Sequence, residues 1–200
     1  MDKQDLRVRK TIQQIDNALL AILRKTSFDR VTVDMLCREA MINRSTFYRY
    51  YEDKYDLLNK YTDRILAEFR ACVKVDFVQA TVFNVNDPVY QKNFLELLNH
   101  IYEHREIYLT LANGSAGRDI WDEMSVIIQE NILRELQKDS KIPPENERYI
   151  RLYARLFSSD LMAMILWWFD CDGEVSADDI KALMTANMKD GSFKTFKGYL

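Results

Sequence analysis

The sequence predicts an all-α fold, with an N-terminal three-helix helix-turn-helix head on a larger helical body. The chain of 200 residues holds only five glycines and three prolines, and neither occurs in residues 1–87. A β-rich chain would need many more turn residues. Apolar residues also recur at three- and four-residue steps, which is the spacing of amphipathic helices. With 48% hydrophobic residues, the chain can bury a sizeable core.

A first helix is expected over about residues 7–25. Its apolar residues form one stripe at helical spacing, made of Ile12, Ile15, Leu19, Ile22 and Leu23. Phe28 and Val31 lie in the loop that follows, and we expect them to fill the small core of the head.

A helix-turn-helix is expected over residues 32–51. Thr32 can N-cap its first helix, and Asp34 is favourable near the positive end of that helix. The turn begins at Met41, and Asn43 is a suitable N-cap for a second helix that runs to the end of the segment.

The body is expected to consist of long helices. The first begins at residues 52–56 and reaches about residue 78, so it can join head and body without a flexible linker. After a break at residues 84–88, helices are expected over about 88–104, then to 112, over 118–138, over 144–170, and from a capping box at Ser176 and Asp179 to 188. We place the domain boundary so that residues 1–54 form the head and residues 55–200 the body.

Charge is unevenly placed along the chain. The net charge is −3, but residues 1–54 carry a net charge of +3 and residues 55–200 one of −6. A mildly basic head on an acidic body is typical of a protein that presents one end to phosphate.

The cysteines and the hydropathy pattern predict the compartment. Cys37, Cys72 and Cys171 include no CxxC pair, which indicates small apolar residues in a reducing compartment rather than disulfides or a zinc site. The N-terminus has no apolar signal segment, and the longest apolar run, Leu161–Phe169, is too short to span a membrane. We expect a cytoplasmic protein without a membrane partner.

The helix-turn-helix segment resembles the TetR family of bacterial transcription regulators. The resemblance covers about Thr11–Leu58 and rests on Thr46-Phe47-Tyr48, Tyr50, Tyr51, Lys54 and Leu57-Leu58. The chain departs from the family pattern at Met41 and Ser27, where the family usually has glycine, and a methionine with positive φ would be strained. In the body, Phe94–Leu111 and the pair Trp167-Trp168 followed by Gly173 resemble a subgroup common in Gram-positive bacteria. One branch of that subgroup acts as a coactivator of dihydroxyacetone utilisation.

The resemblance implies that the second helix of the motif enters a DNA major groove. Arg44 would bond the O6/N7 edge of guanine, and Phe47 is expected in the core instead. Tyr48, Tyr50 and Lys54 would bond phosphates, and Thr32 would offer its hydroxyl and N–H to another phosphate. The predicted DNA-binding set is Thr32, Asn43, Arg44, Ser45, Thr46, Tyr48, Arg49, Tyr50 and Lys54. Arg7, Arg9 and Lys10 form either an arm against the DNA backbone or a solvated terminus.

The resemblance also implies a dimer and an effector. Apolar residues cover most of the helix circumference in residues 149–169, so a partner helix is expected to pack on this helix, with a fully intrachain core as the alternative. The predicted dimer contacts are Leu161, Ile165 and Trp168. The predicted effector-binding residues are Phe69, Phe94, Leu98, Tyr102, Tyr108, Trp121, Met124, Tyr153 and Phe157, for each of which plain core packing is the alternative.

The predicted function is a homodimeric repressor that a small apolar effector releases from a palindromic operator in double-stranded DNA. The alternative is a coactivator or adaptor of the same family that acts mainly through protein contacts. Met41 in the turn keeps this alternative open.

One enzyme-like pattern occurs, because His100-Ile-Tyr-Glu-His104 matches the HxxEH zinc motif. A catalytic zinc needs a third ligand and an open position, and no later partner is evident. We therefore expect no enzymatic activity, no metal and no cofactor. The two histidines are expected to be solvated or to cap a helix, with a regulatory metal site as the alternative.

Overall fold

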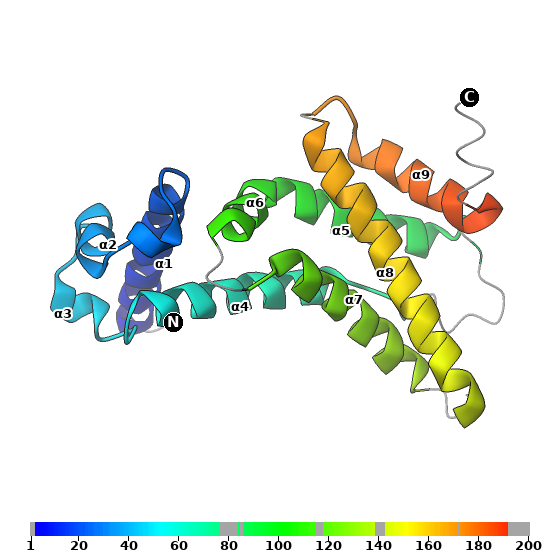
Figure 1. Cartoon of the computed structure of the whole chain (residues 1–200), viewed down its shortest axis with the longest axis horizontal. Helices are drawn as coiled ribbons and strands as arrows, with labels where there is room; N and C mark the ends of the chain where they lie inside the picture. Colours follow the sequence, from blue (N-terminus) through cyan, green and yellow to red (C-terminus); the bar gives the residue numbers. More distant parts are fainter. Residues whose placement is uncertain are drawn as a thin grey trace. The chain divides into compact units, whose positions relative to one another are not determined.

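The structure is a computed structural model that describes residues 3–76, 84, 86–114, 118–138, 143–171 and 173–191. These residues contain helices and no strand, which confirms the predicted all-α class. The helices, shown in Figure 1, are α1 (Lys3–Leu23), α2 (Val33–Glu39), α3 (Arg44–Phe47), α4 (Lys54–Cys72), α5 (Pro88–Glu103), α6 (Arg105–Gly114), α7 (Ile120–Leu136), α8 (Glu147–Asp170) and α9 (Ala177–Asp190). Single 3-10 turns, Phe28–Arg30 and Pro144–Asn146, precede α2 and α8.

The chain divides into two compact units. The first unit consists of Met1–Ala67 with Glu106–Ile120, and the second consists of Glu68–Arg105 with Trp121–Leu200. Because α4 runs through residues 67 and 68, this helix belongs to both units. The predicted boundary after residue 54 separates a DNA-binding domain from an effector-binding and dimerisation domain, and it stays a prediction.

The first unit is built around an apolar core to which α1, α2, α3 and α4 all contribute. Its fully buried side chains include Ile15, Leu19, Leu36, Phe47 and Leu57. Phe28 and Val31, between α1 and α2, are also buried, as the sequence predicts. Burying each large apolar side chain contributes about 1.5–3 kcal/mol relative to leaving it exposed. This core therefore fixes the orientation of α3, which is too short to be stable alone.

In the second unit, α9 packs along α5. The Tyr90 hydroxyl donates to Met188 Sδ at 3.1 Å, and Gln91 Nε2 donates to Thr185 Oγ1 at 3.2 Å. Asp87 caps the start of α5 by accepting from two backbone N–H groups. The start of α9 confirms the predicted capping box.

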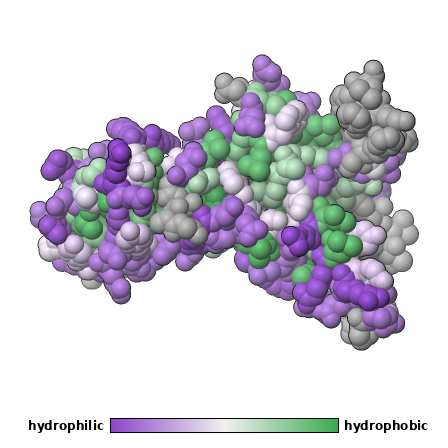
Figure 2. Space-filling model, in the orientation of Figure 1, coloured by the Kyte–Doolittle hydropathy of each residue, from purple (hydrophilic) through white to green (hydrophobic). Residues whose placement is uncertain are grey.

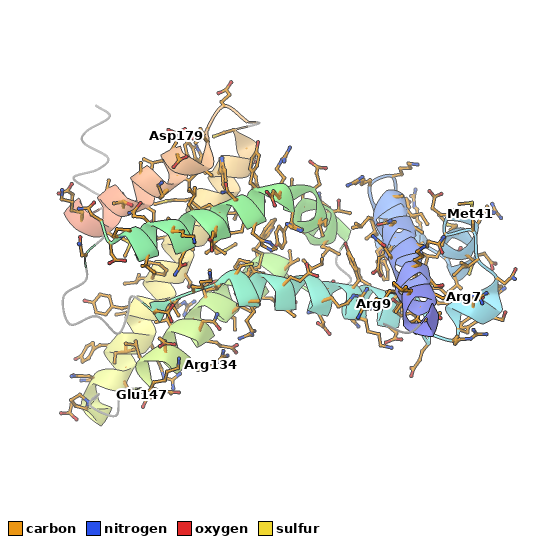
Figure 3. The ribbon with its side chains drawn as sticks, turned by 180° about the vertical axis from the view of Figure 1, so that it is seen from behind. Arg7, Arg9, Met41, Arg134, Glu147 and Asp179 are labelled. Carbon is orange, nitrogen blue, oxygen red and sulfur yellow. The ribbon has the colours of Figure 1, made fainter. Side chains whose placement is uncertain are left out.

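Both hydrogen bonds of that box are present between Ser176 and Asp179, which is labelled in Figure 3.

A buried amide on α7 closes the end of α4. Asn131 Nδ2 donates to the carbonyls of Arg70 and Val73 at 3.3 and 3.0 Å. Arg134, labelled in Figure 3, donates in turn to Asn131 Oδ1 at 3.3 Å. The last carbonyls of a helix lack intrahelical partners, and Asn131 satisfies two groups at this end. The helix thus ends at Cys72 and not near residue 78 as expected.

The predicted end of α3 also differs from the observed one. This helix ends at Phe47 and not near residue 51, although the N–H groups of Tyr48 and Tyr51 still donate to the carbonyls of Arg44 and Phe47. The C-terminal tail beyond residue 191, which the sequence left open, lies outside the described residues. The three cysteines are free. No helix of the described ranges is long and apolar enough to cross a membrane.

Candidate nucleic-acid interface

The turn between α2 and α3 depends on a left-handed backbone at Met41. Its φ is +53°, and it is the only non-glycine residue with positive φ in the described part of the chain. The N–H of Met41 donates to the Arg38 carbonyl at 3.2 Å, and the N–H of Ile42 donates to the Cys37 carbonyl at 3.0 Å. These two bonds form a Schellman motif, which usually has glycine at this position. The strain expected for Met41 is therefore present.

The start of α2 is capped as the sequence predicts. Thr32 Oγ1 accepts from the N–H of Met35 at 3.2 Å, and Asp34 lies in the first turn. A hydroxyl that accepts one hydrogen bond still carries a proton. The exposed Thr32 side chain is therefore able to donate to a phosphate.

The segment that begins with α3 turns its polar side chains outward. Phe47 is fully buried and its ring centroid lies 5.6 Å from that of Tyr51, which confirms that Phe47 belongs to the core. Asn43 caps α3 through its extended backbone and makes no side-chain cap bond. The side chains left at the surface are exposed for Asn43, Arg44, Ser45, Tyr48 and Arg49 and half-buried for Thr46 and Tyr50.

Arg44 is held in place by two neighbours. Its Nη1 lies 3.2 Å from Asp34 Oδ1, and its Nη2 donates to the Tyr48 hydroxyl at 3.4 Å. The guanidinium also lies over the Tyr48 ring, 5.9 Å from the centroid. The hydrogen bond to Tyr48 and the charge of Asp34 raise the pKa of Arg44. Arg44 stays exposed, so its donors remain accessible to a base edge.

Lys54 donates to backbone carbonyls of the first unit, whereas the sequence predicts that it bonds a DNA phosphate. Its Nζ donates to the carbonyls of Phe28, Asp29 and Val31, each at 3.0 Å. It also lies 4.8 Å from the Phe28 ring centroid and 5.2 Å from that of Tyr55. An ammonium has three donors, and all three are used here. This geometry joins the start of α4 to the segment before α2, and we therefore leave Lys54 out of the proposed phosphate contacts.

Two ion pairs fasten α4 within the first unit. Arg64 Nη2 donates to both carboxylate oxygens of Asp16 on α1, at 2.6 and 2.7 Å. Burial raises the pKa of Asp16, and Arg64 offsets part of that rise. Arg118, which precedes α7, lies 2.8 Å from Asp63 and donates to the Asn59 carbonyl at 3.4 Å. Together, these contacts fix α4 relative to α1 and to the segment after α6.

The side chains of the predicted N-terminal arm lie on α1. Arg7 and Arg9, labelled in Figure 3, and Lys10 are all exposed. Contact between this arm and the DNA backbone stays a prediction.

Two of the predicted effector residues line one cavity among the described residues. Phe94 and Phe157 line a cavity of about 20 Å³ in the second unit, which is room for about one water molecule. Its other lining residues are Val73, Lys74, Val75, Tyr90, Asn93, Leu97, Ile128 and Leu161.

The remaining seven residues of the predicted effector set lie elsewhere. Phe69, Leu98 and Met124 are fully buried core residues, and Tyr108 is buried in the first unit. Tyr102 stacks on Trp168, Trp121 meets Phe169 edge-on, and Tyr153 is 68% exposed.

The predicted dimer contacts need correction. Leu161, Ile165 and Trp168 are buried in the core of the chain itself, and Trp168 Nε1 donates to the Val175 carbonyl at 2.7 Å. The same stripe of α8 contains the small residues Ala154 and Ser158, which allow close helix packing.

The opposite side of α8 carries exposed apolar residues, which we call the α8 face: Tyr149, Leu152, Tyr153, Leu156 and Trp167. Apolar side chains reach the surface of the second unit between polar ones in Figure 2.

Family models match both parts of the sequence. Residues 17–61 match the model of "Bacterial regulatory proteins, tetR family". Residues 90–190, half of the chain, match a TetR model described as "Transcriptional regulator C-terminal region".

The chain belongs to the TetR family.

Among curated proteins, this TetR chain is similar to "Uncharacterized HTH-type transcriptional regulator YxbF" of Bacillus subtilis (strain 168). The two are 22% identical over 167 residues, which is 84% of this chain and 42% of that protein. The chain thus spans less than half the length of this relative.

Solved structures share the fold of this TetR chain. A TetR transcriptional regulator from Streptococcus agalactiae 2603V has a TM-score of 0.58 at 18% identity, covering 92% of this chain and 96% of that one. A Clostridium perfringens putative fatty acid metabolism regulator has a TM-score of 0.58 at 19% identity, with 89% and 97% covered. The dihydroxyacetone kinase operon activator DhaS has a TM-score of 0.51 at 14% identity, with 94% and 95% covered.

The two histidines of this TetR chain lie at the end of α5. Their ring centroids are 4.3 Å apart, and His104 Nδ1 lies 2.8 Å from the His100 carbonyl, so His104 closes the helix. Glu96 is paired with Lys74 at 3.0 Å. Within the described residues, no group of three histidine, cysteine or acidic side chains is arranged to hold a metal.

Sequence reasoning missed Asp34 as the partner of Arg44, and it missed the polar lining residues Lys74, Tyr90 and Asn93. The spacing of Asp34 and Arg44 gives no signal, because the turn brings them together. A signal for the α8 face was present, since Ala154 and Ser158 mark the opposite stripe as the one that packs closely.

Proposed function

We propose that this TetR chain is a homodimeric repressor that binds a palindromic operator through two copies of α3. The proposed contacts are Thr32, Asn43, Arg44, Ser45, Thr46, Tyr48, Arg49 and Tyr50. The observation that carries the proposal is the arrangement of α3, where buried Phe47 anchors the segment and exposed Arg44 stands oriented by Asp34 and Tyr48. Arginine in this position suits the two acceptors of a guanine edge.

A gel-shift titration on the promoter region of the gene tests DNA binding. Cationic side chains that bind phosphates release condensed counterions from the DNA. Specific binding should therefore weaken steeply as salt rises, because this release becomes less favourable. Arg44→Ala should cost about 1–3 kcal/mol at its preferred base and relax sequence preference there. Lys189→Ala, which removes an exposed cation in the last turn of α9 in the second unit, is the control and should bind as the unmodified chain does. An unchanged preference in Arg44→Ala would remove the recognition role.

The α8 face supports the dimer. It extends from Tyr149 to Trp167, about 27 Å at the rise of an α-helix, and exposed apolar surface of this extent marks interaction sites. A symmetric partner would also place two α3 helices on half-sites about 34 Å apart or a multiple of that spacing. Leu156→Lys should shift the mass measured by light scattering from dimer to monomer. Val89→Lys, an equally large change at an exposed apolar residue of α5, should leave the mass unchanged.

We expect an effector to release DNA by acting through α4. This helix belongs to both units, and residues 73–75, which follow it, line the cavity of the second unit. A ligand that favours a state with displaced cavity walls would therefore act at the end of α4. The start of the same helix belongs to the first unit. To release DNA, the ligand must bind the state with displaced walls more tightly than the DNA-competent one.

Coactivation through protein contacts is the second candidate. The exposed and strained Met41 favours it, since a large apolar side chain stands at the surface of the head. A stable complex with a second regulator in a size measurement, without specific operator binding, would support this function. Specific operator binding by the chain alone would exclude it as the main activity.

A further inference from the structure

The lining of the cavity in the second unit combines apolar and polar residues. Most of its wall is apolar and comes from Val73, Val75, Phe94, Leu97, Ile128, Phe157 and Leu161. Its polar groups are Lys74, after α4, and Tyr90 and Asn93 on α5. A lining of this kind is complementary to a molecule with an apolar body and one polar head.

The polar part of the lining is built around Lys74. Lys74 is the only cation among the described lining residues, and its Nζ donates to Glu96 Oε2 at 3.0 Å and to Asn93 Oδ1 at 3.5 Å. Lys92 lies 3.7 Å from the other oxygen of the same carboxylate. The hydrogen bond and charge of Lys74 lower the pKa of Glu96, which therefore stays ionised. The exposed ammonium groups of Lys74 and Lys92 thus share the Glu96 carboxylate.

Tyr90 adds a hydrogen-bond donor to the lining. Its hydroxyl donates to Met188 Sδ at 3.1 Å, and a thioether is a weak acceptor. Burial raises the pKa of Tyr90 to about 12, so the phenol keeps its proton at neutral pH. A ligand oxygen in place of the thioether would make this hydrogen bond stronger.

We propose that this cavity binds an amphipathic monocarboxylate with an unbranched apolar tail, whose carboxylate is held by Lys74. The acid takes the place of Asn93 Oδ1, which lies farther from the ammonium than Glu96 Oε2 does, and its tail lies between Phe94 and Phe157. A carboxylate is also the group that Lys74 already holds in Glu96, so the ammonium is placed to pair with one. The inference rests on the proposed function, because it names the effector of the same site.

The small size of the cavity explains how such an acid would regulate. A volume of about 20 Å³ holds about one water molecule and no alkyl chain. The acid therefore binds only a state in which the walls have separated. Binding one state and excluding the other is the differential affinity that an effector needs.

Calorimetric titration of the full chain with octanoate, octanol and octylamine, below micelle-forming concentrations, tests the proposal. Octanoate should bind saturably and roughly tenfold more tightly than octanol, because a charge-assisted hydrogen bond is added, and octylamine should not bind. Lys74→Met should give octanoate and octanol equal Kd values. Lys92→Met, a neighbouring lysine outside the lining, should keep most of the preference. Phe157→Ala should favour longer acids, because it enlarges the apolar part of the cavity.

Three results would overturn the inference: equal Kd values for octanoate and octanol in the unmodified chain, an unchanged preference in Lys74→Met, or no binding of any acid. Operator binding of the ligand-free protein, measured on the same preparation, separates this inference from the proposed function. Operator binding without acid binding removes the effector class and leaves the regulator. Acid binding that depends on Lys74, without operator binding, leaves the site and removes the regulator.

Discussion

Replacing Met41 by glycine is expected to stabilise the first unit. Met41 holds a φ of +53° to close the turn between α2 and α3. A left-handed backbone costs an L-residue about 1–2 kcal/mol, and it costs glycine nothing comparable. The Met41 side chain is 86% exposed, so its removal loses little buried surface.

Entropy of the unfolded chain reduces this gain. Glycine gives the unfolded chain more freedom than a residue with a side chain, which costs about 0.4–1 kcal/mol. The net stabilisation by Met41→Gly is therefore about 0.5–1 kcal/mol. Met41→Ala keeps both the Cβ and the strain, and its stability should lie within about 0.5 kcal/mol of the unmodified chain. Glycine should thus exceed alanine here, the reverse of their order inside a helix.

Urea unfolding with two optical signals measures the effect and shows where it acts. The three tryptophans, Trp121, Trp167 and Trp168, belong to the second unit, so their fluorescence reports that unit. Far-ultraviolet circular dichroism reports helices of both units. The gain should raise the midpoint in circular dichroism, and hydrogen exchange should slow at the amides of α2 and α3.

The comparison of Met41→Gly with Met41→Ala shows whether the backbone is strained at residue 41. If α2 and α3 amides exchange faster in Met41→Gly than in Met41→Ala, the turn is not strained at this position. The left-handed conformation would then be supported by contacts that glycine loses, and the reasoning from backbone sterics would fail.

Three further changes test other parts of the structure. Lys54→Met should destabilise the first unit by about 1.5–3 kcal/mol in urea unfolding, since three carbonyls lose a charged donor. Lys60→Met, at an exposed lysine that pairs with Asp56, should cost under about 1 kcal/mol, and equal costs would contradict the capping role. Asn131→Leu should cost the second unit about 1–3 kcal/mol by tryptophan fluorescence, because two carbonyls at the end of α4 lose their donor; an unchanged midpoint would mean that water replaces the amide. Burial and His104 lower the pKa of His100 below its usual 6.5, so the unfolded chain binds more protons below that pH. The stability that this histidine contributes should be complete above pH 6.5 and be lost as the pH falls through that value, and His100→Gln should reduce the slope of stability against pH.

Helix starts were predictable because their signals are local. Thr32 caps α2 and Ser176 with Asp179 caps α9 through bonds that span three residues, so the sequence alone contains both partners. Helix ends were less predictable where the deciding partner is distant. Asn131 closes α4 from a position about 60 residues later in the chain, and no pattern near Cys72 announces it.

The role of Lys54 shows the same limit within the candidate site. Its spacing from Tyr48 supports the family resemblance, and from that resemblance a phosphate contact was predicted. Its three carbonyl partners lie 23 to 26 residues earlier, in a segment without regular spacing relative to α4. The same basic residue can hold the head together or bind DNA, and only the packing distinguishes the two.

The two faces of α8 show why periodicity alone misplaced the dimer contacts. Apolar residues surround this helix, so spacing does not say which stripe faces inward. Packing does, because Ser158 faces α7, where Ser125 Oγ donates to Ser158 Oγ at 3.1 Å, and Ala154 lies on the same buried stripe. The bulky Leu152, Tyr153 and Leu156 lack such small neighbours and are left outside. Because the first stripe is buried within one chain, the second is the stripe that we propose a symmetric partner covers.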